Sequence, residues 1–293
     1  MKKTKKRDIG TIIGFLFPAV VLYSVFMILP LLMTCYYSFT EWNGITAKVF
    51  VGAANYADML HDRKFWQTLQ NTLILVTFSL IFQISFGLLI AYLLYIKTKG
   101  AKFFRTAYFL PVVIAPVAIG LMFSLFYNSE IGVFNKILES IGLGILKTNW
   151  LSNPKTILGA VMAPQIWQYI GLYITIFLGA FQSVSGDIVE SAQIDGANKS
   201  QTFWHIIIPD IRNFVFISMI LCITGSLKSF DHAWIMTKGG PGVRSAYLGV
   251  YMYKTSFVNS DFGYGSSLSI IIVVLSLIFS QVLSHINDRF ADK

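Results

Sequence analysis

The chain has 293 residues, of which 55% are hydrophobic and 13% are charged, and its mean hydropathy is +0.64. Soluble domains carry about 25% charged residues, so this composition excludes a soluble globular protein and indicates a polytopic membrane protein. The net charge of +9 does not indicate nucleic-acid binding, because the basic residues cluster at the N-terminus and in short loops rather than on a face interleaved with aromatics.

The N-terminus combines a cluster of cations with a long apolar run. The cations lie at positions 2, 3, 5, 6 and 7, and the run extends from Thr11 to about Tyr37. A signal peptide has a shorter apolar region and a small-residue cleavage site, neither of which fits this stretch. We therefore expect a retained first span with a cytoplasmic N-terminus.

Six apolar runs have about the 20 residues that a helix needs to cross a bilayer. They lack the alternation of barrel strands, so we expect an all-α polytopic membrane protein with about six transmembrane helices. No internal repeat or separate soluble domain interrupts them, and we interpret residues 1–293 as a single transmembrane domain. The predicted spans are 11–34, 72–96, 107–127, 157–182, 211–228 and 268–286.

Lysine and arginine residues in short segments predict the orientation. The loop after the second span contains Lys97, Lys99, Lys102 and Arg105, and cationic loops stay in the cytoplasm. An even number of spans then returns the C-terminus to the cytoplasm. On this basis we expect Gln193 to face the cytoplasm, and Asn43 and Gly242 to face outwards.

One outer segment departs from this charge pattern. The segment between the fifth and sixth spans contains Lys238, Arg244 and Lys254, and it is more basic than the loop around Glu190. It opens with a glycine-rich turn, Gly239 to Gly242. The predicted orientation therefore depends on the first two spans.

Several kinds of chemistry are absent from the sequence. No phosphate-binding Gly-x-x-x-x-Gly-Lys-Ser/Thr motif occurs, so the chain is not expected to hydrolyse ATP. The four histidines are scattered, and Cys35 and Cys222 have no metal-ligand spacing, so we expect no metal and no cofactor on this chain. A secondary carrier is the alternative class, but the span interiors lack ionisable residues, and Lys228 and Asp231 lie only at the edge of span five.

A polar segment, residues 185–209, separates two apolar spans and is longer than a connector requires. We expect it to form helix, turn, helix. Asp187 and Glu190 have capping-box spacing for the first helix, and Gly196 fits the left-handed residue that ends it. Asn198 or Ser200 is expected to cap the second helix, and Pro209 to end it.

The second short helix is expected to be amphipathic. Phe203, Ile206 and Ile207 give it an apolar side, and Ile188, Ala192 and Ile194 give one to the first short helix. A helix this short is marginal alone and becomes stable when its apolar side packs into a groove on a partner. The alternative is an interfacial helix lying on lipid headgroups.

The same segment carries a spaced motif. Glu190-Ser191-Ala192 is followed by Gly196 and then by Ile206, Ile208 and Pro209. It resembles the cytoplasmic signature loop of binding-protein-dependent ABC importer permeases, with Ser191 and Ile208 as mild departures. "IDGA" at 194–197, "LFPAVVLYSVFMILPLLMTCYYSFTEWNG" and "TKGGPGVRSAYLGVYMYKTSFVNSDFGYGSSLS" resemble the carbohydrate branch of that family. The likeness is to the first permease of such systems, similar to the larger maltose subunit.

The resemblance implies a fold, partners and a role. The chain would be half of the translocation pathway, paired with a second permease as a heterodimer in a prokaryotic cell membrane. Two ATPase subunits would bind ATP and magnesium, and an extracellular solute-binding protein would deliver a carbohydrate. Another solute, such as glycerol phosphate, is the alternative substrate. The coupling helix would contact an ATPase subunit through Glu190, Ser191, Ala192, Asp195, Gly196 and Pro209.

Polar and aromatic side chains within spans four and five are candidates for the substrate pathway. Sugars stack their apolar faces on aromatic rings and pair their hydroxyls with polar groups. The alternative is that these side chains pack and hydrogen-bond between helices. The resemblance places Trp167, Ser226 and Ser229 at sugar-contacting positions. The candidates are Trp167, Tyr169, Tyr173, Cys222, Ser226 and Ser229.

Overall fold

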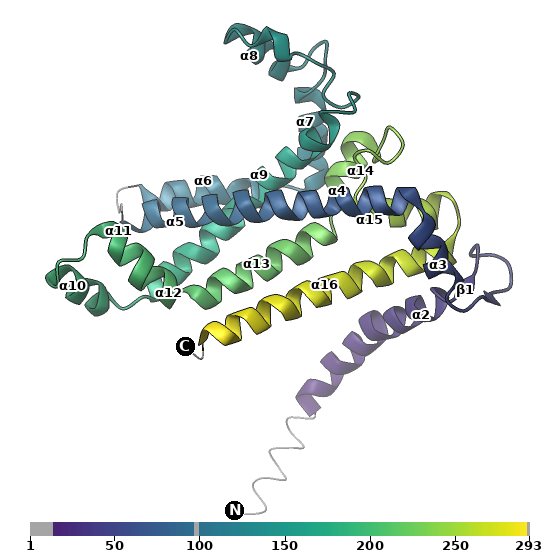
Figure 1. Cartoon of the computed structure of the whole chain (residues 1–293), viewed down its shortest axis with the longest axis horizontal. Helices are drawn as coiled ribbons and strands as arrows, with labels where there is room; N and C mark the ends of the chain where they lie inside the picture. Colours follow the sequence, from purple (N-terminus) through teal and green to yellow (C-terminus); the bar gives the residue numbers. More distant parts are fainter. Residues whose placement is uncertain (1–13, 97–99, 292–293) are drawn as a thin grey trace, which may run out of the picture. The chain divides into compact units, whose positions relative to one another are not determined.

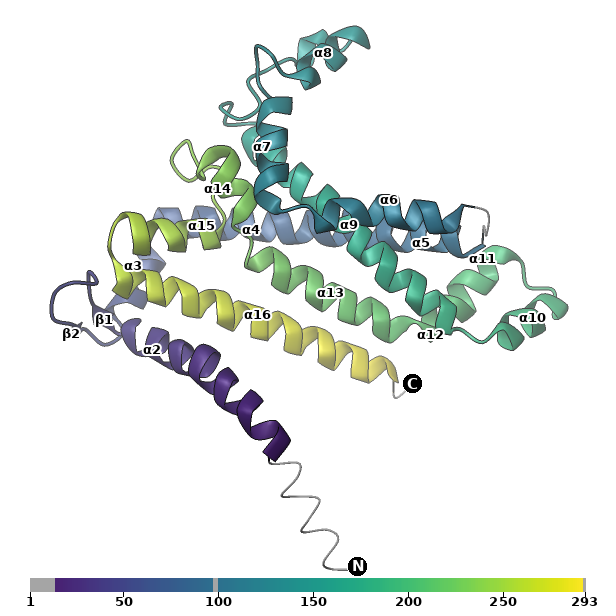
Figure 2. The same ribbon diagram turned by 180° about the vertical axis from the view of Figure 1, so that it is seen from behind.

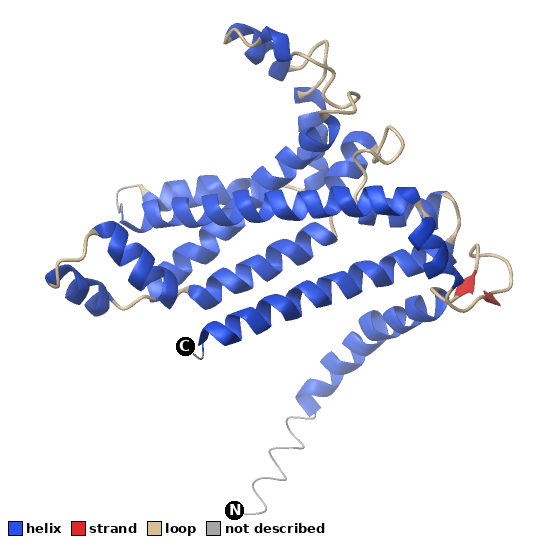
Figure 3. Ribbon diagram, in the orientation of Figure 1, coloured by secondary structure: helices blue, strands red, loops and turns tan. Residues whose placement is uncertain are grey.

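The computed structural model describes residues 14–96 and 100–291 of the chain (Figure 1). The predictions for the N-terminal cations, for Lys97 and Lys99, and for the last two residues lie outside the described residues. Helices dominate the described part of the chain, and the strands found there form one short antiparallel pair (Figure 3). The predicted all-α fold class is confirmed.

The long apolar helices agree with the expected number of spans. Within the described residues, five helices are long and apolar enough to cross a membrane, and a sixth span results if a bent helix pair is counted as one. The five helices are Gly14–Tyr37, Arg63–Ile96, Ile157–Ser183, Arg212–Thr237 and Phe262–Arg289, and the bent pair is Ala101–Val113 with Pro116–Phe126.

The second helix begins well before the expected residue 72. It starts at Arg63, because the Asp62 side chain accepts a hydrogen bond from the Lys64 backbone N–H and caps the helix. A search for apolar runs misses the first turns of this helix, because they contain the polar residues Gln67 and Gln70.

The chain divides into two compact units, which are described separately. Unit 1 comprises residues up to His61 together with Met252–Ile271. Its apolar helix Gly14–Tyr37 is followed by a strand pair in which Thr40 faces Phe50. The elements of unit 1 are η1 (Ser24–Ile28), α2 (Leu29–Tyr37), β1 (Thr40–Glu41), β2 (Val49–Phe50), α3 (Ala54–His61), η5 (Lys254–Val258) and the start of α16 (Phe262–Ala291).

Unit 2 comprises Asp62–Tyr251 and the chain from Ile272 onwards, and it contains most of the apolar helices. Its first helical elements are α4 (Arg63–Ser79), η2 (Leu80–Ile84), α5 (Ser85–Ile96), α6 (Ala101–Val113), α7 (Pro116–Phe126), α8 (Val133–Ser140), η3 (Gly144–Leu146) and α9 (Ile157–Ser183). They are followed by α10 (Gly186–Ile194), α11 (Lys199–Thr202), η4 (Phe203–Ile207), α12 (Ile208–Asp210), α13 (Arg212–Leu227), α14 (Asp231–Thr237), α15 (Leu248–Tyr253, to Tyr251 in this unit) and the rest of α16. The single-domain interpretation stays a prediction.

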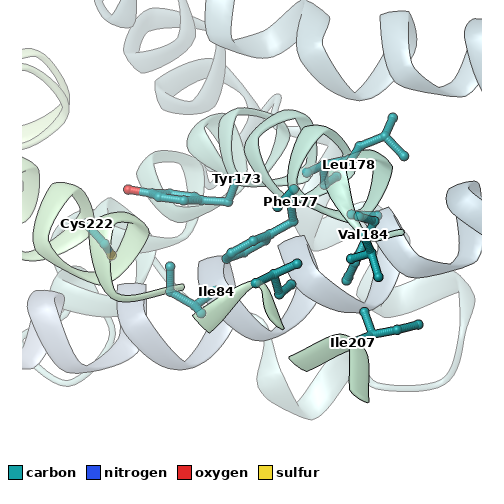
Figure 4. Close-up of a cluster of buried hydrophobic side chains, with 12 residues drawn as sticks. Ile84, Tyr173, Phe177, Leu178, Val184, Ile207 and Cys222 are labelled. Carbon is teal, nitrogen blue, oxygen red and sulfur yellow. The ribbon is translucent and has the colours of Figure 1, made fainter. Parts of the chain in front are cut away.

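Helix α9 packs closely against α5 and α6, as Figure 1 shows. Two glycines allow this approach. A Cβ atom added at Gly87 would lie 2.8 Å from Tyr173 Cβ, and one added at Gly171 would lie 1.9 Å from the Tyr108 carbonyl oxygen. Small residues bring membrane helices close enough for extensive van der Waals contact. The resulting cluster of buried side chains includes Phe177, Phe181 and Ile207, and Figure 4 shows part of it.

The bent pair has a local cause and a stabilising contact. Pro116 opens α7, and the residue before a proline avoids the helical region, so Ala115 is extended with ψ 132°. The two helices consequently meet at 92°. The Gln168 side chain on α9 donates a hydrogen bond of 2.9 Å to the Ile114 carbonyl oxygen, which the bend removes from the helix ladder.

The helices of unit 2 give it two distinct ends. Segment 185–209, with α10 and α11, lies at one end, and α14 lies at the other, in both views (Figures 1 and 2). We call these the α10 end and the α14 end.

Candidate functional site

A cavity of about 290 Å³ lies between α9, α13 and α14, with Gln83 of η2 in its wall. Aromatic rings, amides and hydroxyls line it together. The lining residues are Gln83, Gln165, Tyr169, Leu172, Tyr173, Leu221, Cys222, Gly225, Ser226, Lys228, Ser229, Phe230, Asp231 and His232. Five of the six predicted substrate-pathway residues therefore line this cavity, and the exception is Trp167.

Trp167 lies on the opposite side of α9. Residues advance about 100° each around a helix, so Trp167 is about 200° from Gln165, whereas Tyr169 is close to the Gln165 face. Trp167 is 44% exposed and lines a separate apolar groove. Its ring centroid lies 5.8 Å from that of Phe123. Its place in the substrate pathway stays a prediction, and the cavity does not support it.

The apolar groove is bordered by a ladder of three rings. Phe78, Phe82 and Phe86 stack with centroid separations of 6.0 and 5.8 Å. Gly159 and Ala163 of α9 line the same groove, which contains almost no polar surface. It therefore offers a sugar few hydrogen-bonding partners, unlike the cavity.

Hydrogen bonds hold the polar side chains of the cavity in place. The Ser229 hydroxyl donates to Gln165 Oε1 at 2.8 Å, and the Cys222 thiol donates to Gln83 Oε1 at 3.4 Å. Gln83 Nε2 donates in turn to the Ile166 carbonyl oxygen at 3.3 Å. These contacts join η2, α9 and α13, so the cavity wall is pre-arranged by three segments distant in the sequence. Figure 4 shows Tyr173 and Cys222 on two of them.

The sequence predictions missed several cavity residues. Gln83 is nearly fully buried in the middle of a span, and a single amide in an apolar helix is the signal that identifies such a position. Lys228 and Asp231 place one cation and one anion at the cavity. His232 is 2% exposed, and its Nε2 has no hydrogen-bond partner among the described residues.

The first helix of segment 185–209 differs from the expected cap. Helix α10 begins at Gly186 with Ser185 as its N-cap, and no side chain caps it. The predicted capping box of Asp187 and Glu190 is therefore wrong. Asp187 instead lies in the first turn, where a carboxylate interacts favourably with the helix dipole.

The turn and the second helix agree with the expectation. Gly196 has φ +86°, and the Gly196 and Ala197 N–H groups donate to the Gln193 and Ala192 carbonyl oxygens at 3.1 and 2.9 Å. This pair of bonds is the Schellman arrangement that ends helices at a left-handed glycine. Asn198 caps α11 in a reciprocal capping box with Gln201. Helical structure continues through Pro209 to Asp210, one residue past the predicted end.

The apolar side chains of the segment fall into two groups. Ile207 is buried and Phe203 packs against Tyr92, with 4.4 Å between their centroids, so both belong to the chain's own core. The exposed apolar side chains are instead Ile188, Ile194 and Trp204, at 50%, 86% and 62%. The expectation that Phe203 and Ile207 fill a groove on a partner is therefore wrong, whereas Ile188 and Ile194, on the expected apolar side of the first helix, are exposed.

The motif residues of this segment are mostly at the surface. Glu190, Ser191, Asp195, Gly196 and Pro209 are exposed, and Ala192 is buried. No ion pair involves Glu190 within residues 14–96 and 100–291. In the same described residues, no three His, Cys, Asp or Glu side chains lie close enough to hold a metal ion.

The family profile of the binding-protein-dependent transport system inner membrane component matches residues 83–292, and the chain belongs to this family. The match covers most of unit 2, including the cavity and segment 185–209. Membership favours an ABC importer permease over a secondary carrier.

Relatives of this family align over nearly the whole chain. The chain is 34% identical to the probable ABC transporter permease protein YurN of Bacillus subtilis over 91% of this chain and 92% of that protein. It is 31% identical to the multiple sugar-binding transport system permease protein MsmF of Streptococcus mutans over 94% of each.

The fold matches a solved transporter chain. A bacterial ABC transporter involved in the import of the acidic polysaccharide alginate contains a chain that superposes with a TM-score of 0.84 at 22% identity, covering 98% of each chain. A second structure, of the alginate transporter with an alginate pentasaccharide-bound periplasmic protein, gives the same TM-score over 99% of this chain and 97% of that one. At this identity the likeness establishes the fold.

Proposed function

We propose that this chain is a permease subunit of an ATP-driven importer for an uncharged carbohydrate. The observation that carries the proposal is the cavity, where Tyr169 and Tyr173 lie beside the paired Gln165 and Ser229 within an apolar helix bundle. Aromatic rings with fixed amides and hydroxyls suit the alternating apolar faces and hydroxyls of a sugar. The relative MsmF, named as a multiple sugar-binding transport system permease, supports this substrate class.

The charge of the cavity favours an uncharged substrate. Lys228 and Asp231 contribute one charge of each sign, and the other polar lining residues are amides, hydroxyls, a thiol and one histidine. Repulsion between Asp231 and a phosphate or uronate group would cancel much of the favourable binding energy that Lys228 provides to that anion. Vicinal sugar hydroxyls, which both donate and accept, can satisfy both side chains. This argues for a neutral sugar over glycerol phosphate or an acidic polysaccharide.

The partners follow from the exposed segment and the family. Segment 185–209 presents Glu190, Ile194 and Trp204 at the α10 end, and no described part of this chain covers them. We assign this surface to an ATPase subunit, so the α10 end is cytoplasmic and Gly242, at the α14 end, is outside. The charge pattern of the first two spans and the even number of spans make both termini cytoplasmic as well. ATP and magnesium bind the two ATPase subunits. A second permease completes the pathway, and an extracellular binding protein delivers the sugar.

Uptake measurements test the function. The chain, produced with the permease, ATPase and binding-protein genes that neighbour its own and reconstituted in proteoliposomes, should take up radiolabelled maltose or another neutral sugar from a panel only when ATP is inside. Uptake driven by a proton or sodium gradient without ATP would instead establish the secondary carrier.

Filling the cavity should weaken sugar transport specifically. Ser226→Leu places two extra heavy atoms among buried lining residues, and overpacking costs roughly 1–3 kcal/mol. We expect the KM for sugar uptake to rise about 5- to 100-fold, since each 1.4 kcal/mol is a factor of about ten. The measurement is uptake against sugar concentration.

The matched control is Thr224→Leu on the same helix. Thr224 bonds to its own helix at the Ile220 carbonyl oxygen and does not line the cavity. Its KM should stay within about two-fold of the wild type, because the cavity is unchanged. An equal rise in KM for the two variants would show that the cavity is not part of the transport pathway.

A further inference from the structure

A buried amide lies in the middle of the second span. Gln83 is 3% exposed and belongs to a continuous apolar helix, Arg63–Ile96, in which α4, η2 and α5 follow one another. A polar side chain inside a membrane span is costly to bury, and such residues often mark functional positions. Gln83 also lines the cavity, although it lies on a different helix from most of the lining residues.

The helix geometry changes where Gln83 lies. Residues Leu80–Ile84 form η2, a single π-helical turn between two α-helical stretches. Such turns are rare and occur frequently at functional sites. Phe82 stays on the outer side of the turn, 38% exposed and stacked between Phe78 and Phe86, whereas Gln83 is buried. The π-helical turn is therefore located where a side chain of this span reaches both α9 and α13.

Both ends of the Gln83 amide are bonded to protein. Oε1 accepts a hydrogen bond from the Cys222 thiol of α13 at 3.4 Å, and Nε2 donates to the Ile166 carbonyl oxygen of α9 at 3.3 Å. The neighbouring Gln165 accepts from Ser229, just past the end of α13, at 2.8 Å. Two bridges therefore join α9 to the α13 segment, and the Gln83 bridge is the one supplied by a third helix.

The Gln83 bridge adjoins a predicted sugar-binding side chain. Tyr173 and Cys222 belong to the same buried cluster, and Figure 4 shows the Tyr173 ring extending from α9 towards Cys222. Without the bridge, α9 and α13 lose one of the contacts that fix their separation at the cavity. Binding groups that are held in place bind more tightly than groups that must be ordered by the ligand.

We infer that Gln83 is a positioning residue for the transported sugar, and that its amide holds α9 and α13 at the separation at which the cavity binds the substrate. This inference rests on the proposed function, because it takes the cavity as the sugar site. Gln83 acts on the sugar through Cys222 and the α9 wall, since its own bonds are made to protein. A loss of binding of this kind raises KM and leaves the maximal rate unchanged.

Gln83→Met removes the bridge at nearly constant side-chain length. In the reconstituted complex we expect the KM for ATP-driven sugar uptake to rise about ten-fold and the maximal rate to stay within about two-fold. Gln83→Asn, which is too short to make both bonds, should give the same rise in KM if the methionine variant does not accumulate.

The S–H stretching band of Cys222 reports on the bridge directly. It is measured by infrared spectroscopy in a Cys35→Ala background and assigned by difference against Cys35→Ala/Cys222→Ala, since the chain has two cysteines. In Gln83→Met the band should move to higher frequency, because the thiol has lost its acceptor.

The matched control is Gln168→Met. Gln168 is also a buried amide in a span, and its Nε2 donates to the Ile114 carbonyl oxygen at 2.9 Å, but it does not line the cavity. This variant should lower the thermal stability of the complex, because a buried hydrogen bond is lost. Its KM should stay within about two-fold of the wild type, and its S–H band should not move.

A double variant tests whether Gln83 acts through Cys222. If the two side chains work as a unit, Gln83→Met/Cys222→Ala should raise KM by less than the product of the two single effects. Multiplicative effects, an unchanged KM or an unmoved S–H band in Gln83→Met, or an equal rise in KM in the Gln168 control would overturn the positioning role. Absence of ATP-driven sugar uptake by the wild type instead overturns the proposed function.

Discussion

Gly171→Ala is expected to abolish accumulation of the folded subunit in the membrane. The added Cβ would lie 1.9 Å from the Tyr108 carbonyl oxygen and 3.1 Å from Phe109 Cα, both backbone atoms of α6. Backbone cannot rotate away as a side chain can, so α9 and α6 must separate along their length. Overpacking costs about 1–3 kcal/mol where side chains adjust, and we expect at least the upper value here. The measurements are membrane abundance and thermal stability of the purified complex.

Gly179→Ala is the matched control on the same helix. No atom lies within 4 Å of a Cβ built at Gly179, and Gly171 and Gly179 are both interior residues of α9. Alanine is the better helix former, so this variant should be as stable as the wild type or slightly more stable. Comparable losses from the two variants would mean that α9 does not pack on α6 as described.

Gly196→Pro is expected to disconnect the permease from its ATPase subunits, so that stimulated ATP hydrolysis and transport are lost together. Proline requires φ near −65°, whereas Gly196 has φ +86°, and it lacks the N–H that donates to the Gln193 carbonyl oxygen. We expect a local cost of about 3 kcal/mol, which redirects α10 relative to α11. The spans are untouched, so the subunit should still insert. Binding-protein-stimulated ATPase activity and sugar uptake should both fall at least ten-fold.

Gly196→Asn tests whether coupling requires the left-handed turn or specifically a glycine at this position. Asparagine tolerates the left-handed region and keeps the N–H, and a Cβ atom at this position meets no atom within 4 Å. It should retain more than half of the stimulated activity. If the proline variant also keeps full stimulation and uptake, segment 185–209 is a connector without a coupling role.

Patterns set by local backbone chemistry were predictable from the sequence. Gly196 and Asn198 behave as expected, because a left-handed turn and a capping box depend on residues only a few positions apart. Asp187 was wrongly predicted to cap the first helix. The helix instead begins at Gly186, with Ser185 as its N-cap, and the residue spacing alone does not exclude this earlier start. The start of α4 at Arg63 was missed because polar residues in its first turns break the apolar count without breaking the helix.

Residue spacing in the sequence could not predict which side chains are buried and which line the cavity, because tertiary packing determines both. Phe203 and Ile207 form an apolar side in the sequence, but only the fold shows that α5 and α9 occupy it and leave Ile194 exposed. Gln83 joins the cavity through Cys222, 139 positions away. The span-four candidates were a single stretch in the sequence, whereas helix geometry places Tyr169 and Trp167 on different sides of α9.

Photo-crosslinking from position 194 tests the coupling of this permease to an ATPase most directly. Ile194 is the most exposed apolar side chain of segment 185–209, so a photoreactive phenylalanine analogue there should not disturb the core. In the assembled complex we predict an ultraviolet-dependent product containing this chain and an ATPase subunit, and none from the same analogue at Gly242, which is exposed in the loop that follows α14. Absence of the product from position 194, or an equal yield from position 242, would contradict the assignment of segment 185–209 to the ATPase.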